Sequence, residues 1–171
     1  GDDVFDEDDL ALLRDMGIRT FPDSRPSLDF EPEYIAEGAD GNLYVTLQEA
    51  NAVAVFDMET LAFTNIFSAG AVDHSLPGNG IDPSDRNSGI DIRTIPVMGL
   101  RMPDSITTVE IDGETYFLTA NEGDSRDFEE VRIKDVTLDP TAFPNAAALQ
   151  EDDQLGRLTI SGIDGDVDND G

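Results

Sequence analysis

Short apolar runs with a period of two dominate the chain from residue 33 onward. Four of them follow one another closely, at 34–36, 43–47, 53–56 and 63–67. Alternation of apolar and polar side chains is typical of half-buried strands, and Asp40-Gly41 between the first two runs is a hairpin turn signal. Four short strands joined by tight turns predict one antiparallel blade of the kind that builds β-propellers.

The order of features in this blade recurs once along the chain. Four features follow one another over 31–49 and again over 102–122: an acidic residue after a proline, a strand, an Asp-Gly turn, and a strand ending in Thr-x-(Gln/Asn)-Glu. Aligning the two segments by these features places Thr46 opposite Thr119. We therefore predict a mostly β fold of propeller-like, antiparallel four-stranded blade units, about two in number, with two long inserts and minor helix.

The inserts lie near 72–101 and 123–153, and the second contains a predicted helix at 144–150, where three alanines and a leucine favour helix. A short helix is also predicted at 8–16, ended by Gly17, and a last strand at 156–161. The predicted organisation is an acidic N-terminal segment over 1–29, a propeller-like region over 30–161, and an Asp-rich end over 162–171.

The charge of the chain excludes some classes of binding partner. Its 171 residues include 38 Asp and Glu against 10 Lys and Arg, which gives a formal net charge of −28. Such a charge repels phosphate backbones and anionic bilayers, so we expect neither nucleic acid nor a membrane surface as a partner. Two interpretations of the acidity stay open: solubility in a saline habitat, where salt screens self-repulsion, and binding of divalent cations by carboxylates.

Absent residue types exclude further classes of site. The chain has no cysteine and a single histidine, His74, which excludes disulfides, thiolate metal sites, cysteine nucleophiles and sites with several histidines. No apolar run approaches the roughly 20 residues of a bilayer-spanning helix, so no membrane insertion is expected. No signal peptide is recognisable and the first residue is not Met, which indicates a mature or truncated product.

The C-terminal segment is the clearest local motif. Alternating aspartates occupy the first, third, fifth and seventh places of a loop, as at the start of a calcium loop, although the glutamate that completes such a loop is missing. The alternative is a solvated acidic linker. The candidate calcium ligands are Asp164, Asp166, Asp168 and Asp170.

A second set of carboxylates follows the predicted strand ends in both repeats. In a propeller such ends meet at the central channel, where carboxylates could share calcium and a metal-bound water could attack a phosphate ester. The alternative is that they cap strand ends and accept backbone hydrogen bonds in turns. The candidates are Glu33 and Glu122 for catalysis, and Glu49, Asp104, Asp124 and Asp127 for the metal.

The inserts hold the remaining candidates. His74 and Ser75 are adjacent and no nucleophile elbow is present, so no Ser-His-Asp triad is predicted. His74 stays a candidate metal ligand or general acid–base, against the alternative of a loop held by Asp–Arg pairs. Arg126 and Arg132 are candidate phosphate ligands, against the alternative that they and Lys134 neutralise neighbouring carboxylates.

Five segments of the chain are distinctive: EPEYIA (31–36), VTLQEAN (45–51), DHSLPGNG (73–80), TANEGDSRD (119–127) and LDPTAFPN (138–145). Together they resemble the choice-of-anchor I family. The resemblance implies a secreted or surface-attached protein with a propeller-like repeat region, and some relatives carry alkaline-phosphatase or surface-glycoprotein labels. Because family members are usually longer, it also implies that this chain is an internal section.

These observations lead to one main functional hypothesis and two alternatives. The main hypothesis is an extracellular or cell-surface structural or adhesion module, stabilised by calcium and without catalysis of its own. One alternative is a calcium-dependent phosphoesterase that resembles alkaline phosphatase. The other is a self-assembling module that pairs with further copies, or with the remaining blades of a parent protein, through exposed strand edges.

Overall fold

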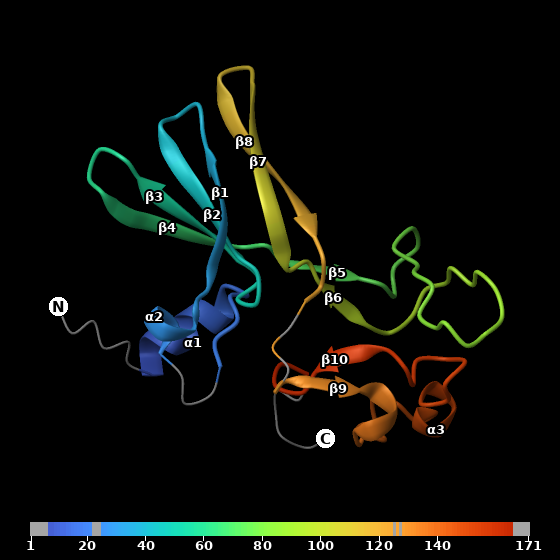
Figure 1. Cartoon of the computed structure of the whole chain (residues 1–171). Helices are drawn as coiled ribbons and strands as arrows, with labels where there is room; N and C mark the ends of the chain where they lie inside the picture. The colour runs from blue at the N-terminus through green and yellow to red at the C-terminus, as the bar shows by residue number, and fades with distance from the viewer. Residues whose placement is uncertain (1–6, 22–24, 125, 127, 166–171) are drawn as a thin grey trace. The chain divides into compact units, whose positions relative to one another are not determined.

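The computed structural model describes residues 7–21, 25–124, 126 and 128–165 (Figure 1). The protein is mostly β, with three short α-helices and one 3₁₀ turn among the described residues. It divides into two compact units: the first comprises Gly1–Ala71 and Leu100–Asp124, and the second comprises Val72–Gly99 and Ser125–Gly171.

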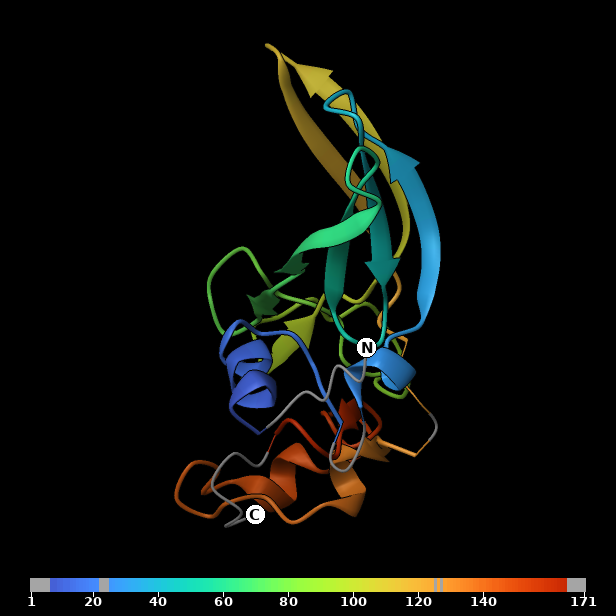
Figure 2. The same cartoon turned by 90° about the vertical axis from the view of Figure 1, so that its left-hand side faces the viewer.

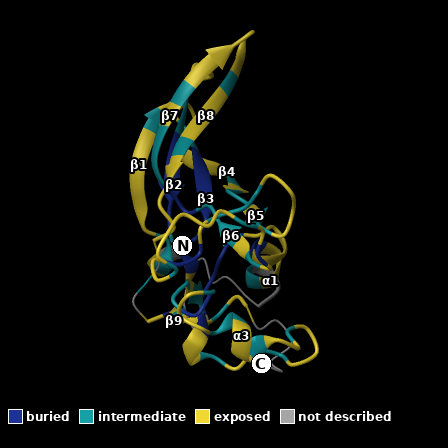
Figure 3. Cartoon of the chain, turned by 90° about the vertical axis from the view of Figure 1, so that its right-hand side faces the viewer, coloured by how far each residue is buried: buried dark blue, intermediate teal, exposed yellow. Residues whose placement is uncertain are grey.

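A four-stranded antiparallel sheet forms the centre of the first unit. Each strand pairs with the next one along the chain, in the order β1 (Pro32–Glu37), β2 (Asn42–Leu47), β3 (Ala52–Asp57) and β4 (Ala62–Ser68). The four apolar runs that alternate in the sequence all lie within these bounds, so the predicted antiparallel unit is confirmed. Buried residues concentrate in β2 and β3, the two central strands (Figure 3).

The second repeat is a long hairpin rather than a four-stranded unit. Its strands β7 (Pro103–Ile111) and β8 (Glu114–Asn121) form a separate two-stranded sheet. The described residues therefore contain one complete four-stranded unit and form no closed propeller.

The hairpin nevertheless repeats the geometry of β1 and β2. The register shifts between Pro32 and Ile35 in the first pair, and at the equivalent Pro103 and Ile106 in the second. At the tip of the hairpin, Asp112 and Gly113 have φ values of 55° and 83°, as a two-residue type I′ turn requires. The repeat inferred from the sequence is therefore present in the backbone.

One face of the four-stranded sheet packs against the hairpin. Tyr44, Val53 and Val55 form a buried cluster that Ile106 of β7 covers, and the rings of Tyr44 and Phe117 lie 5.6 Å apart. Thr46, which is fully buried, donates from Oγ1 to the Asp104 carbonyl at 2.7 Å and accepts the Tyr34 N–H at 3.0 Å. Apolar contact and hydrogen bonds together hold the two repeats face to face.

The opposite face of the sheet is covered at its base by the N-terminal segment. Leu13 of α1 (Glu7–Asp15) and Ile18 pack against Val45 and Leu47 of β2, with Phe30 just after α2 (Pro26–Asp29) at the edge of the cluster. Figure 2 shows both helices near the base of the strands. The predicted helix at 8–16 is confirmed, one residue earlier than expected.

The second unit contains most of both inserts. It contains β9 (Glu130–Arg132) with β10 (Thr159–Ser161), η1 (Ile133–Asp135), α3 (Ala146–Leu149), and all but the outermost residues Ala71 and Leu100 of the pair β5 (Ala71–Asp73) and β6 (Met98–Leu100). Ile95 from the first insert is buried against Ile133 and Leu155 from the second. The two inserts, which the sequence analysis treated as separate loops, therefore share one core.

The described helices are all short. None of them has both the length and the apolar character that a bilayer-spanning helix requires.

Candidate carboxylate site

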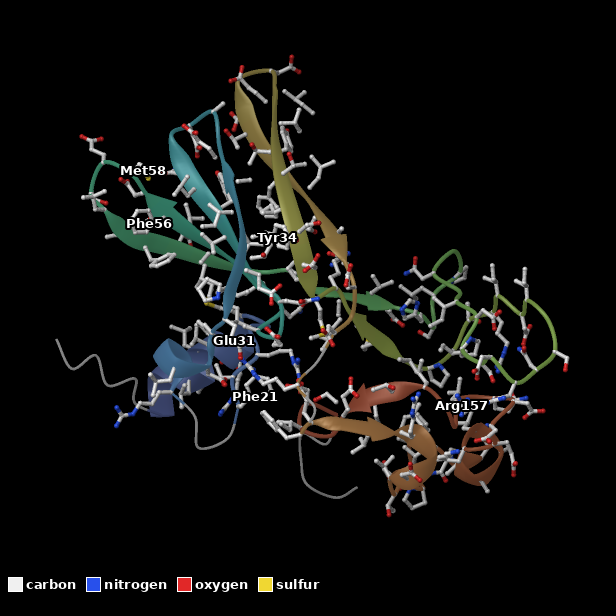
Figure 4. All side chains as sticks on the ribbon, viewed as in Figure 1. Phe21, Glu31, Tyr34, Phe56, Met58 and Arg157 are labelled. Carbon is white, nitrogen blue, oxygen red and sulfur yellow. The ribbon has the colours of Figure 1, made fainter. Side chains whose placement is uncertain are left out.

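Three of the carboxylates predicted at strand ends come together in the first unit, where the two repeats adjoin. Glu33 lies on β1, Glu49 follows β2 and Asp104 lies on β7. Asp104 is placed to accept a hydrogen bond from the protonated Glu33 carboxyl, and the negative charges of Glu49 and Asp104 both act on Glu33. We call these three residues the carboxylate junction; Figure 4 labels two neighbours in the sequence, Tyr34 on β1 and Glu31 just before it.

The junction is electrostatically unfavourable for its own carboxylates. Desolvation, the charges of Glu49 and Asp104, hydrogen bonding of the protonated carboxyl to Asp104 and the charge of Glu31 all raise the pKa of Glu33 above its ordinary value. A carboxyl group with a raised pKa binds its proton more tightly in the folded chain than in the unfolded one. Stability therefore falls as the pH rises through the titration of Glu33.

Glu49 supplies an independent observation at the same place. Its Oε2 atom is buried and has no hydrogen-bond partner among the residues that the structure describes. A buried carboxylate oxygen without a donor is costly, and a bound cation would satisfy it. As they stand, no three described Asp, Glu or His side chains are arranged to enclose a metal ion. The donor chemistry of the junction fits calcium, whose remaining ligands can be carbonyls and water.

The other strand-end carboxylates are placed differently. Glu122 is exposed, and its backbone N–H donates to the Met102 carbonyl at 3.3 Å; it is not among the charges that raise the pKa of Glu33. Asp124 is also exposed and belongs to the first unit. Asp127 lies outside the described residues.

Most of the C-terminal aspartate ladder is also outside the described residues, namely Asp166, Asp168 and Asp170. Asp164 is described, and its Oδ2 accepts a hydrogen bond of 2.8 Å from the Ser161 hydroxyl. The same hydroxyl accepts the Asp164 N–H at 3.2 Å, which is a local turn arrangement. The calcium loop stays a prediction.

His74 is packed into the backbone of the second unit. Its Nδ1 lies 2.6 Å from the Asn79 carbonyl, to which it donates, and a Cβ at position 99 would collide with its ring. Neighbouring Asp73 accepts both the N–H and the hydroxyl of Ser75. Glu33 and Glu122 belong to the first unit and His74 to the second, so the three catalytic candidates do not form a set within either unit.

The basic residues of the second unit mostly pair with carboxylates and carbonyls. Arg157 donates to both oxygens of Asp85, at 2.6 and 3.3 Å, and Lys134 lies 2.8 Å from Asp152. In the first insert, Arg93 lies 2.9 Å from Asp91. These pairs agree with the alternative in which basic side chains neutralise carboxylates and hold the inserts in place.

The two candidate phosphate ligands have partners of their own. The Arg126 N–H donates to Glu129 Oε1 at 3.1 Å, and Arg132 donates from Nη1 to the Arg157 carbonyl. Arg132 also lines a cavity of about 230 Å³ with Glu130 and Asp135. The role of Arg126 and Arg132 as phosphate ligands stays a prediction.

The sequence analysis assigned no role to Asn51, which the structure makes central to the first unit. Asn51 is 1% exposed and has a φ of 52°. Its side-chain amide donates to the Gly70 carbonyl at 3.1 Å, and its Oδ1 accepts the Met102 N–H at 2.9 Å. The signal that could have found it is its type, since Asn adopts the left-handed region more readily than other non-glycine residues and can bond to the backbone from there.

The fold and the junction define a mostly β, antiparallel-sheet domain that carries acidic groups between repeats. The family model described as the choice-of-anchor I domain matches residues 4–171, and the chain belongs to this family. The family makes it a surface-associated, anchor-type domain of a cell-surface or secreted protein. Neither the curated proteins nor the solved structures gave a match to the chain.

Proposed function

We propose that the chain is a structural module of a secreted or cell-surface protein, built from propeller-type blade repeats whose junction is stabilised by calcium. The observation that carries the proposal is the carboxylate junction: Glu33, Glu49 and Asp104 gather at the contact between repeats, although their charges repel one another. Placing like charges together is destabilising unless a cation or a proton compensates them.

Calcium would supply the compensating positive charge, taking carboxylates, carbonyl oxygens and water as ligands. Glu33 and Asp104 belong to different repeats, so an ion held by both would link β1 to β7. Glu49 would contribute its buried Oε2 atom, which has no hydrogen-bond partner among the described residues, as a ligand of the ion. The role of these residues in the proposal is mechanical: they hold the hairpin against the sheet.

Without calcium, Glu33→Gln is expected to stabilise the chain at pH 7. The variant removes one of the repelling charges, and we expect a rise in Tm on the order of 2 °C, because partly exposed charges contribute at most about 1 kcal/mol. At pH 4 the gain should shrink, because Glu33 with its raised pKa is then largely protonated in the folded wild type. Thermal unfolding followed by circular dichroism in a chelator measures both values.

Glu59→Gln is the matched control for this comparison. Glu59 is an exposed carboxylate in the turn between β3 and β4, and its substitution removes the same charge away from the junction. An equal gain from both variants at pH 7 would show that overall charge, and not the junction, is responsible.

With calcium, the wild type is expected to melt at a higher temperature and Glu33→Gln to lose most of that increase. Saturation to about 100 times the Kd would add about 2.7 kcal/mol, which corresponds to a rise in Tm of about 5–10 °C for a chain of this size. Glu59→Gln should keep the full increase. A calcium-independent Tm in the wild type contradicts the proposal, and phosphomonoester turnover that Glu33→Gln abolishes would replace it with a catalytic role.

A further inference from the structure

The β7–β8 hairpin has two faces with different surroundings. Ile106, Thr108 and Phe117 face the four-stranded sheet: Ile106 covers its buried cluster, Phe117 contacts Tyr44, and Thr108 donates to the Glu37 carbonyl at 2.5 Å. Because side chains alternate along a strand, the residues between these ones point to the other side. No element among the described residues of the first unit forms a layer against that second face.

The outer face of the hairpin is mainly apolar, with Thr107 and, at its tip, Glu114 opposite Ile111 as its polar members. The register places Val109 opposite Tyr116 and Thr107 opposite Leu118, and Ile111 continues the same row of β7. Tyr116 is 51% exposed and Leu118 is 55% exposed. The side chains on a solvent-facing strand face are normally polar. A contiguous group of exposed apolar side chains on such a face therefore indicates a contact surface.

The repeat shows what kind of surface fits this face. The paired bulges make Ile106 equivalent to Ile35 and Leu118 equivalent to Tyr44. Tyr44 lies on the face of the sheet that receives the hairpin. The outer face of the hairpin is therefore the counterpart of a face that already accepts a second β layer within this chain.

The complementary surface lies on the far side of the four-stranded sheet. Ile106 takes part in the contact between the hairpin and the Tyr44 face of the sheet. Its equivalent in the first repeat, Ile35, lies on the other face of the sheet, in the row of Val45 and Ala54. Above the part that α1 covers, this face presents Ile35 and the edge-to-face pair of Phe56 and Phe63. Ile35 is 60% exposed and Phe63 is 62% exposed.

We propose that a second copy of this chain stacks its Ile35–Phe63 face onto the Tyr116–Leu118 face of the hairpin. The contact continues the sheet-to-hairpin packing already present within the chain, and it uses sheet faces rather than strand edges. Because the two faces differ, the contact is heterologous, and each dimer keeps one free face of each kind. Stacking can therefore proceed to longer assemblies or to a ring.

Salt is expected to promote this association. Each copy carries a formal net charge of −28, so copies repel at low ionic strength, whereas the contacting side chains are apolar and depend little on salt. Sedimentation velocity of the full chain from micromolar to submillimolar concentration should show mainly monomer in dilute buffer and concentration-dependent dimers and larger species in molar sodium chloride.

Two exposed substitutions and a control test the faces. Leu118→Ser and Phe63→Ser should each weaken association at high salt about tenfold or more, the size of effect expected at the centre of an interface. Ile90→Ser removes an even more exposed apolar side chain from the second unit and should leave association unchanged. A wild type that stays monomeric at the highest salt and concentration, or an equal loss in Ile90→Ser, overturns the proposal.

Mixing the two variants tests the head-to-tail arrangement. Leu118→Ser keeps an intact Ile35–Phe63 face and Phe63→Ser keeps an intact hairpin face, so an equimolar mixture should form dimers that neither variant forms alone and that grow no further. Failure of the mixture to associate, with both variants folded by circular dichroism, contradicts stacking between these two faces.

Discussion

Asn51→Ala is expected to lower the free energy of unfolding of the first unit by about 3–5 kcal/mol. The substitution leaves the Gly70 carbonyl and the Met102 N–H without their bonds to the Asn51 side chain, and each buried group left unpaired costs about 1–3 kcal/mol. It also places alanine at a φ of 52°, where Asn is tolerated better. Urea denaturation followed by circular dichroism measures the loss.

Two further variants make this result specific. Asn51→Asp keeps the acceptor for the Met102 N–H but buries a carboxylate against the Gly70 carbonyl oxygen, so we expect a loss at least as large as that of Asn51→Ala. Asn65→Ala removes an exposed asparagine from β4 and should change stability by less than about 0.5 kcal/mol. Similar values for Asn51→Ala and Asn65→Ala would show that Asn51 does not hold the two repeats together.

Ile95→Ala is expected to lower the stability of the second unit by about 2–5 kcal/mol. Ile95 is 2% exposed, and its side chain packs in the cluster that contains Ile133 and Leu155 of the other insert. Truncation leaves a cavity that both inserts line. Amide hydrogen exchange should therefore accelerate over 130–135 and 155–161 as well as around residue 95.

The control for this variant lies in the same insert. Ile90 is 88% exposed, so Ile90→Ala should leave exchange in both inserts unchanged. Faster exchange confined to 72–99 in Ile95→Ala would contradict a shared core, because the second insert would then be stable without the first.

Local patterns were sufficient to predict the strands of the first unit. The alternation over 43–47 and 53–56 and the two Asp-Gly turns are short-range signals, because strand periodicity and turn conformation depend on neighbouring residues. The register between strands is a longer-range property. The sequence match of Thr46 with Thr119 is one residue away from the structural match of Val45 with Thr119, which the paired bulges establish, and such a slip exchanges the two faces of a strand.

The shared core of the inserts could not be predicted in this way. Ile95, Ile133 and Leu155 stand in irregular segments without helix or strand periodicity, and Ile95 is separated from the others by the whole second repeat. For the candidate site, the repeat correctly suggested that Glu33 and Asp104 have related places, because each follows a proline at the start of a strand. The repeat gave no indication that Glu122 would lie apart from the charges that act on Glu33.

A residue-resolved calcium titration tests the central claim most directly, namely that the carboxylate junction binds calcium between the two repeats. In ¹⁵N–¹H spectra of the full chain, the account predicts saturable shifts of the amides at 31–34, 48–50 and 103–105, which disappear in Glu33→Gln and persist in Glu59→Gln. Shifts confined to 164–171, or small shifts spread over the surface without saturation, would contradict it, because calcium would then bind the aspartate ladder or the general negative charge instead.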